Sequence, residues 1–140
     1  MSFDDIRTGS VVLYPYLWER EQQRGETEGR KPRETAVGLR LEREGEDDAL
    51  ILLSITSTPP KSGEAAVEVP ETERHRAGLD RGKRLWIMLS EFNYDVVGQS
   101  FYLEPVPPLG KFSDAFFKPI VARIIKAAQT QAAKAVRRDV

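Results

Sequence analysis

The sequence predicts a mainly β fold that ends in one α-helix, arranged as a small barrel or sandwich with the helix packed on it. Several short apolar stretches are bounded by glycine, proline or charged residues, which is the pattern of strands. Only the C-terminal part of the chain has a clear helical period. The helices that would alternate with strands in a doubly wound fold are missing from the pattern.

Four segments are expected to form the main strands. They are Ser10–Tyr16, Thr35–Leu41, Ala49–Thr58 and Leu85–Ser90. The third has the longest apolar run, and Pro59 and Pro60 end it because proline cannot pair within a central strand. Two weaker candidates are Ala65–Val69 and Val96–Leu103, the second with Gly98 at the position of a bulge.

Turn and helix signals complete the expected order of elements. The acidic sequence from Glu44 to Asp48 is typical of a hairpin tip, and one helical turn is expected over Arg74–Ala77. A C-terminal helix is expected over about 119–137, because Pro119 suits the first helical position and apolar residues recur on one face. These apolar residues are Ile120, Val121, Ile124, Ile125 and Ala128. Lys134, Arg137 and Arg138 would then complement the helix dipole in the last turn.

Length and composition restrict the classes of protein. The 140 residues are expected to form a single domain over 1–140, with a core that needs no disulfide. The absence of cysteine and the single histidine, His75, exclude thiol chemistry and any metal site that needs two imidazoles. A net charge of −1 disfavours a broad nucleic-acid-binding surface but leaves room for a local patch. The acidic start and the lack of a long apolar segment predict a cytoplasmic protein without a membrane span.

The segment from Glu19 to Glu34 is expected to be a long loop between two strands. It interleaves five basic residues with five glutamates, and the basic residues are Arg20, Arg24, Arg30, Lys31 and Arg33. Loops of this length are usually functional or disordered. One interpretation is a mobile loop that offers guanidinium groups to a phosphate, with a carboxylate nearby for proton transfer. The other is a solvated surface loop held by ion pairs.

Hydroxyl side chains end the third strand. Thr56, Ser57 and Thr58 could bind phosphate or ribose, or serve only as turn residues. Glu91 and Asn93, which follow the fourth strand, could face the same cleft. The chain contains no phosphate-binding loop, dinucleotide fingerprint, serine-hydrolase elbow or zinc-protease motif. Arginine, hydroxyl and carboxylate groups remain, and they suit cleavage of RNA through its own 2′-hydroxyl.

The order of these segments resembles the MazF/PemK (Kid) family of toxin ribonucleases, in a divergent PemK-like branch with a longer first loop. The resemblance covers about residues 8–128. In chain order, the matching segments are Gly9–Val12, Gly29–Glu34, Ile55–Pro60, Val67–Pro70, Ala77–Leu79 and Trp86–Asn93.

This resemblance implies an SH3-like β-barrel of the CcdB/PemK/MazF type that cleaves single-stranded RNA without metal or other cofactor. It also implies a homodimer that a cognate antitoxin protein neutralises. By position, Arg33 corresponds to the family's catalytic loop arginine, Thr56 to the threonine that holds the scissile phosphate, and Glu28 or Glu26 to a variable loop carboxylate. The expected RNA-binding residues are Arg30, Lys31, Ser57 and Thr58.

The chain departs from the family pattern at two positions. Glu34 stands after Arg33 where the family has proline, and Gly38 stands in the second strand where a large β-branched residue is common. Glu34 could pair with Arg33 and lower its availability to phosphate, or it could be the general base. Two alternatives therefore stay open. One is a non-catalytic module of the same fold that binds nucleic acid or a protein partner, and the other is a gyrase-directed toxin.

Overall fold

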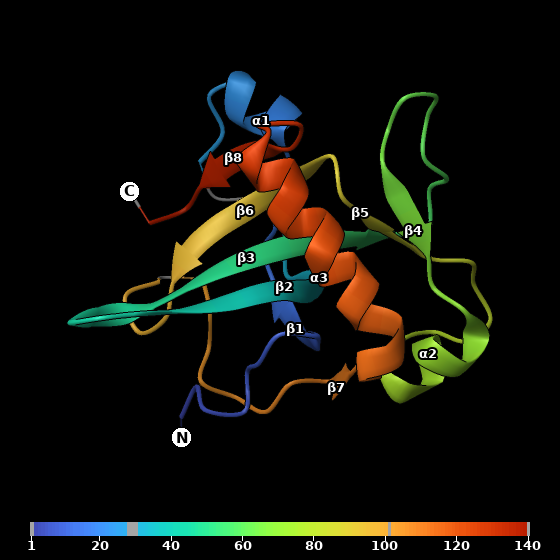
Figure 1. The fold of residues 1–140 in the computed structure, drawn as a ribbon, viewed down its shortest axis with the longest axis horizontal. Helices are drawn as coiled ribbons and strands as arrows, with labels where there is room; N and C mark the ends of the chain where they lie inside the picture. Colours follow the sequence, from blue (N-terminus) through green and yellow to red (C-terminus); the bar gives the residue numbers. More distant parts are fainter. Residues whose placement is uncertain (1, 28–30, 101, 140) are drawn as a thin grey trace.

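The fold is built on a long hairpin formed by β2 (Arg33–Arg43) and β3 (Glu46–Thr56), which projects as a two-stranded tongue in Figure 1. The computed structural model describes residues 2–27, 31–100 and 102–139. Arg43 pairs with Glu46, so the hairpin closes on a two-residue turn. Gly45 in this turn has a φ of 72°, which L-residues rarely adopt. The hairpin tip predicted from the acidic sequence is confirmed.

β3 is the central strand, because three other strands pair with it. β2 occupies one edge of β3 along most of its length. On the other edge, β6 (Glu91–Val96) pairs with the first half of β3 and β5 (Trp86–Met88) pairs with Ile55 and Thr56 at its end. All three pairings are antiparallel.

Outer strands extend this centre into a curled half-barrel. They are β1 (Ser10–Tyr14) beside β2, β7 (Gly110–Lys111) beside β1, β4 (Ala66–Glu68) beside β5 and β8 (Lys134–Arg137) beside β6. The β6–β8 pairing is parallel, and the other pairings of the described residues are antiparallel. The protein is therefore mainly β, as the sequence predicts.

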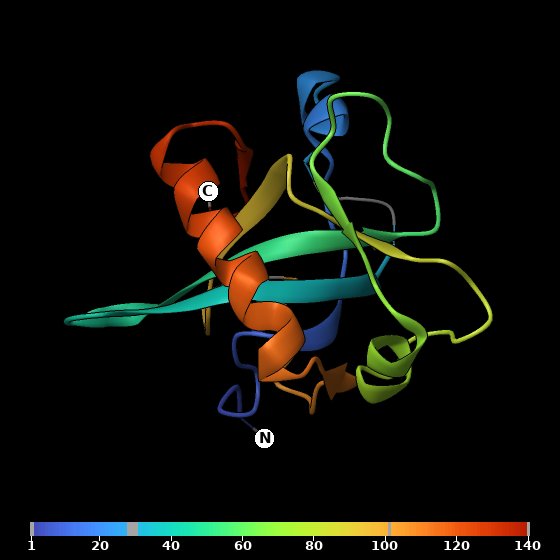
Figure 2. The same cartoon turned by 45° about the vertical axis from the view of Figure 1, so that its right-hand side comes forward.

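Three helices of the described residues lie outside the sheet. They are α1 (Glu19–Gln23), α2 (Glu71–Arg76) and α3 (Asp114–Gln129). α3 crosses the face of the sheet formed by β2 and β3, as both views show (Figures 1 and 2). It begins after Ser113, whose Oγ accepts a hydrogen bond from the Phe116 N–H at 3.2 Å. None of these helices combines the length and the apolar character that crossing a bilayer requires.

Apolar clusters fill both faces of the sheet. The cluster beneath α3 includes Val11, Ala36, Ile51, Leu53, Ile87, Phe112, Phe117, Ile120 and Ile124. The cluster on the other face includes Ile6, Val12, Tyr14, Tyr16, Val37, Leu50, Leu52, Val97 and Leu103. Successive side chains of a strand point to opposite faces, and both faces of β3 are covered. This explains why β3 has an uninterrupted apolar sequence.

Gly38 of β2 lies beneath Ile124 of α3. A Cβ atom at this position would lie 3.0 Å from Ile124 Cδ1 and 3.1 Å from Leu53 Cδ1. Both neighbours belong to the cluster beneath α3, so the side chains that fill this space come from the helix and from β3. Glycine at position 38, where the resembling family commonly has a large β-branched residue, therefore leaves the space that Ile124 and Leu53 fill.

Two of the weaker sequence predictions have different outcomes. The segment Ala65–Val69 does contain a strand, β4. The strand predicted over Val96–Leu103 is wrong, because β6 ends at Val96 and the described residues after it form a turn around Gly98, whose φ is 83°. The sequence prediction missed β6, although Phe92, Tyr94 and Val96 alternate with polar residues as they do in a strand.

The helix predicted over about 119–137 is displaced. α3 starts at Asp114, so Pro119 lies inside the helix rather than at its first position. The chain leaves the helix through Gln131, which has a φ of 57°, and then forms β8. Lys134 and Arg137 therefore belong to a strand and do not lie in a helical turn. Arg138, also assigned to that turn, is buried, with its guanidinium 4.0 Å from the Tyr102 ring centre.

The predicted loop from Glu19 to Glu34 contains ordered structure at both ends. α1 occupies its first five residues, and Glu21 Oε1 accepts a hydrogen bond from the Trp18 N–H at 3.0 Å. β2 begins at Arg33, so this residue belongs to a strand end and not to the loop itself. The tight pairing of Arg33 with Tyr14 of β1 brings it into the sheet.

We expect Gly38→Val to destabilise the protein by about 1–3 kcal/mol, the usual cost of overpacking a filled core. The cost should be smaller in an Ile124→Val background, because that change removes the Cδ1 atom nearest to the new side chain. Urea unfolding of the wild type, both single variants and the double variant measures the coupling. An equal cost in both backgrounds would contradict this account of the packing.

Candidate functional site

A groove opens at the end of the β2–β3 hairpin opposite its tip, and we call it the strand-end groove. Its volume is about 630 Å³. The chain segments that line it are the start of β2, the end of β3 and the connection between α2 and β5. The lining residues are Lys31, Pro32, Arg33, Glu34, Ile55, Thr56, Ser57, Thr58, Leu79, Asp80, Lys83 and Leu85.

Strand pairing brings two predicted site residues together. Thr35 pairs with Ser54, so Arg33 and Thr56 each lie two residues further along, at the same end of the hairpin. The Thr35 hydroxyl donates a hydrogen bond to the Arg33 carbonyl oxygen at 2.9 Å, which links the first residues of β2. The sequence predicted these two residues from different segments, and the groove contains both.

The strand-end hydroxyls are presented by a local turn. Thr56 Oγ1 accepts a hydrogen bond from the Thr58 N–H at 3.0 Å, a turn typical of Ser and Thr. The Thr56 hydroxyl hydrogen is therefore not used by this bond and can donate to a bound oxygen. Ser57 and Thr58 are exposed beside it. Three hydroxyl groups thus line one side of the groove.

The cations of the groove form no ion pairs with the carboxylates of the described residues. Lys31, Arg33 and Lys83 are exposed, and none of them forms an ion pair with another described residue. Of the two roles left open for Glu34, the ion pair with Arg33 is not formed, although both residues line the groove. Free cations together with hydroxyl donors are the groups that bind phosphate.

Two of the predicted residues, Glu28 and Arg30, lie outside the described residues. Lys83 and Asp80 were not predicted, and both come from the connection before β5. The signal that could have identified this connection is the run Arg81-Gly82-Lys83-Arg84, a basic turn that follows the Ala77–Leu79 segment.

Glu91 and Asn93 do not face Thr56, contrary to prediction. Asn93 is buried and hydrogen-bonds both backbone groups of Leu17, at 2.9 and 2.7 Å. Glu91 Oε2 accepts hydrogen bonds from the Glu19 N–H at 2.9 Å and the Tyr16 hydroxyl at 3.1 Å. Both side chains therefore hold the segment before α1 against β6.

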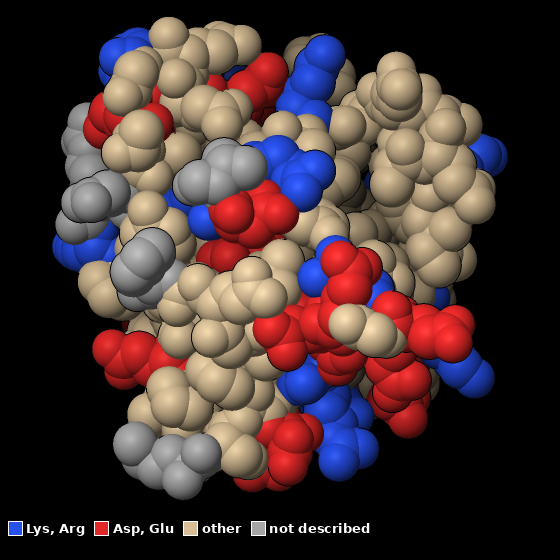
Figure 3. Space-filling model, turned by 90° about the vertical axis from the view of Figure 1, so that its left-hand side faces the viewer, with Lys and Arg blue, Asp and Glu red and all other residues tan. Residues whose placement is uncertain are grey.

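Acidic side chains gather away from the groove. The turn of the hairpin and the adjoining strand ends carry exposed Glu42, Glu44, Glu46 and Asp47. Figure 3 shows the face of the molecule toward which this tip projects, with acidic side chains crowded over part of it. Carboxylates therefore outnumber cations at the tip of the hairpin, while the groove at its other end contains Lys31, Arg33 and Lys83 beside Glu34 and Asp80.

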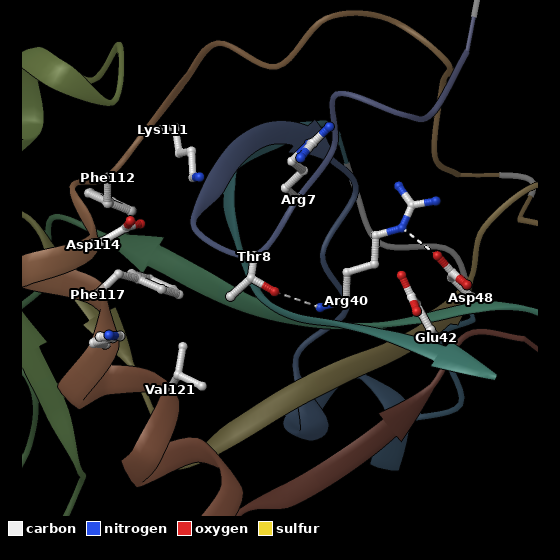
Figure 4. A pocket seen from close by; sticks show the side chains of 11 residues that line it. Arg7, Thr8, Arg40, Glu42, Asp48, Lys111, Phe112, Asp114, Phe117 and Val121 are labelled. Carbon is white, nitrogen blue, oxygen red and sulfur yellow. Dashed lines mark hydrogen bonds and ion pairs between the residues drawn. The ribbon is translucent and has the colours of Figure 1, made fainter.

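A second hollow of about 380 Å³ lies between α3 and the start of β1 (Figure 4). Its charges are mixed, and Arg40 is already committed: Nε pairs with Asp48 at 2.7 Å, while Nη1 donates to the carbonyls of Phe3 and Ile6. Arg40 thus anchors the N-terminal segment on the sheet. The strand-end groove is the stronger candidate because, within the described part of the chain, its cations form no ion pairs.

Comparisons with protein-family models, with curated proteins and with solved structures found no match to this chain. Within the described ranges, no group of three or more histidine or carboxylate side chains is placed to hold a metal ion. The chemistry of the strand-end groove therefore has to follow from its own residues. These residues are suited to an anionic, phosphate-bearing ligand.

Glu91 makes folding stability depend on pH. Burial raises the pKa of its carboxyl above the ordinary value, although the two hydrogen bonds it accepts oppose that shift. The folded protein then binds this proton more tightly than the unfolded chain does, so the free energy of unfolding rises as the pH falls through that pKa. Glu91→Gln keeps an oxygen acceptor for Glu19 and Tyr16 but cannot titrate.

We expect the wild type to gain stability relative to Glu91→Gln as the pH falls from neutral to about 4.3, the ordinary pKa of glutamate. Urea unfolding of both proteins across this range measures the difference, and titrations that the two proteins share cancel. A stability difference that stays constant, or that changes in the opposite direction, would show that the Glu91 pKa is not raised.

Proposed function

We propose that the strand-end groove binds single-stranded RNA and that the protein cleaves it as a metal-independent endoribonuclease. One observation carries this proposal: Lys31, Arg33 and Lys83, unpaired among the described residues, share a groove with the hydroxyl group of Thr56. An RNA backbone supplies both the phosphate charge that these cations need and its own 2′-hydroxyl nucleophile.

The proposed reaction uses these groups in defined roles. A groove carboxylate takes the proton of the 2′-hydroxyl, whose oxygen attacks the adjacent phosphorus. The bond from phosphorus to the 5′-oxygen breaks, and this oxygen receives a proton from a general acid. Arg33 stabilises the charge that develops on the phosphorane, and the Thr56 hydroxyl donates to one of its oxygens. The products are a 2′,3′-cyclic phosphate and a 5′-hydroxyl end.

Two carboxylates in the described part of the groove can serve as the base. Asp80 Oδ1 already accepts a hydrogen bond from the Gly82 N–H at 2.8 Å, so its second oxygen remains for the proton. Glu34 lies beside Arg33 and forms no ion pair with it. Glu28, which the family resemblance favours as the carboxylate, lies outside the described residues.

The resemblance to MazF/PemK toxins extends the proposal to the biological role. We infer a type II toxin with an SH3-like barrel of the CcdB/PemK/MazF type, acting in the cytoplasm and neutralised by a cognate antitoxin protein. Exposed Leu13, Val106 and Leu109 beside an apolar hollow support a homodimer, because apolar patches of this kind mark interaction surfaces. The antitoxin would prevent RNA from reaching the strand-end groove.

A non-catalytic RNA-binding module is the second candidate. It is favoured by the position of Glu34, which brings a negative charge next to the residue expected to hold the phosphate. In that case the same groove would bind RNA and leave it intact. Growth arrest on expression with altered DNA supercoiling and intact RNA would instead support a gyrase-directed toxin.

We expect the purified protein to cut single-stranded RNA in the presence of EDTA and to leave cyclic phosphate ends. Arg33→Ala should lower the cleavage rate by about 10²–10³-fold, the usual loss when one group that stabilises an oxyanion is removed. Arg33 has no ion pair among the described residues, so the melting temperature should stay within a few degrees of the wild type. Gel electrophoresis of labelled RNA and end-group analysis measure these outcomes.

Arg123→Ala is the matched control, because Arg123 is an exposed arginine on α3 and does not line the groove. It should cleave RNA at the wild-type rate. RNA that stays intact at high protein concentration would remove the catalytic proposal and leave the binding module.

A further inference from the structure

The connection from Leu79 to Leu85 forms one wall of the strand-end groove, and its ends are anchored in the protein. Leu79 and Leu85 are buried in the cluster beneath α3. The Leu79 N–H donates to the Arg74 carbonyl, and the Leu85 carbonyl accepts from the Val69 N–H, both at 2.8 Å. Only the tip of the connection projects into solvent, and Lys83 lies at this tip.

The Arg74 guanidinium of α2 hydrogen-bonds the backbone at the tip of this connection. Nη1 donates to the Val69 carbonyl at 2.8 Å, and Nη2 donates to the Arg81 carbonyl at 2.9 Å. One planar group thus joins the residue after β4 to the tip of the connection. A guanidinium can make both bonds at once in a fixed geometry, whereas a lysine ammonium is only a point charge on a flexible stem.

An ion pair between Arg84 and Glu68 attaches the C-terminal side of the tip to β4. Arg84 Nε and Nη2 each donate to one carboxylate oxygen of Glu68 at 2.8 Å. The Arg84 guanidinium also lies 5.0 Å from the centre of the Trp86 ring. Within the tip, Asp80 Oδ1 accepts from the Gly82 N–H. Lys83 is therefore carried by a backbone that is held on both sides, while its own side chain has no ion-pair partner among the described residues.

We propose that Lys83 binds the RNA phosphate next to the scissile one, and that Arg74 is a positioning residue that holds Lys83 at the groove. The inference rests on the proposed function, since Arg33 and Thr56 define which phosphate is cleaved. Arg33 starts β2 and Lys83 belongs to the connection before β5, so two separate chain segments each bring a cation to the groove. A strand that crosses the groove presents successive phosphates to these two segments. The substrate is therefore a single strand that presents two consecutive phosphates to the groove.

The salt dependence of binding tests the role of Lys83. For single strands, log K falls with log salt concentration by about 0.7 for each phosphate contact. With a labelled 2′-O-methyl RNA of randomised sequence, which lacks the nucleophile, Lys83→Ala should reduce this slope by about 0.7. Lys126→Ala, an exposed lysine of α3, should keep the wild-type slope. In cleavage assays, Lys83→Ala should raise KM and leave kcat unchanged, because the contact is present before and during the reaction.

Non-additivity tests the role of Arg74. Arg74→Ala should reduce the salt slope as Lys83→Ala does, and the double variant should bind no more weakly than Lys83→Ala alone. A purely structural role would lower the melting temperature and leave the slope at the wild-type value. Arg74→Lys, which keeps the charge but not both carbonyl bonds, should fall between wild type and Arg74→Ala. If Arg74→Ala does not fold, Arg74→Lys gives the same comparison.

Arg33→Ala separates failure of this inference from failure of the proposed function. A reduced slope for Arg33→Ala with an unchanged slope for Lys83→Ala would overturn the assignment of Lys83 alone. Unchanged slopes for both variants would show that RNA does not bind in the strand-end groove, and the proposed function would fail with it.

Discussion

The change of partner along β3 is the constraint on which the rest of the structure depends. Leu52 pairs with Asn93 and Ile55 pairs with Ile87, so three steps along β3 match six steps along the neighbouring chain. β5 and β6 thus run one after the other beside β3, with three extra residues between their pairings. The second edge of β5 pairs with β4, which satisfies its remaining backbone groups.

This pairing positions the strand-end groove. Trp86, the first residue of β5, pairs with Thr56, so the connection that precedes β5 emerges beside the end of the β2–β3 hairpin. Lys83 of this connection and Arg33 of β2 then line the same groove. The acidic tip lies at the other end of the 11-residue strands β2 and β3. This separation exceeds the distance over which exposed charges interact strongly in physiological salt, so the carboxylates of the tip do not cancel the cations of the groove.

The polar residues of β6 have partners that the sequence did not predict. Asn93 and Asp95 alternate with Phe92, Tyr94 and Val96, a period-two pattern that favours a strand with its polar face toward solvent. In the structure both are buried and satisfied: Asn93 bonds the Leu17 backbone, and Asp95 accepts from the Tyr14 hydroxyl at 2.6 Å. These partners lie more than seventy residues away in the chain. Local sequence patterns cannot reveal bonds between such distant segments.

The sequence by itself determined the four main strands, the acidic hairpin tip and the presence of a C-terminal helix, because apolar periodicity and turn residues act over a few neighbours. It also placed Arg33 and Thr56 among the site residues. Only the tertiary structure decided that β8 follows the helix, that Arg138 is buried and that Lys83 completes the groove. Each of these depends on pairing or packing between segments far apart in the chain, where local propensity carries no information.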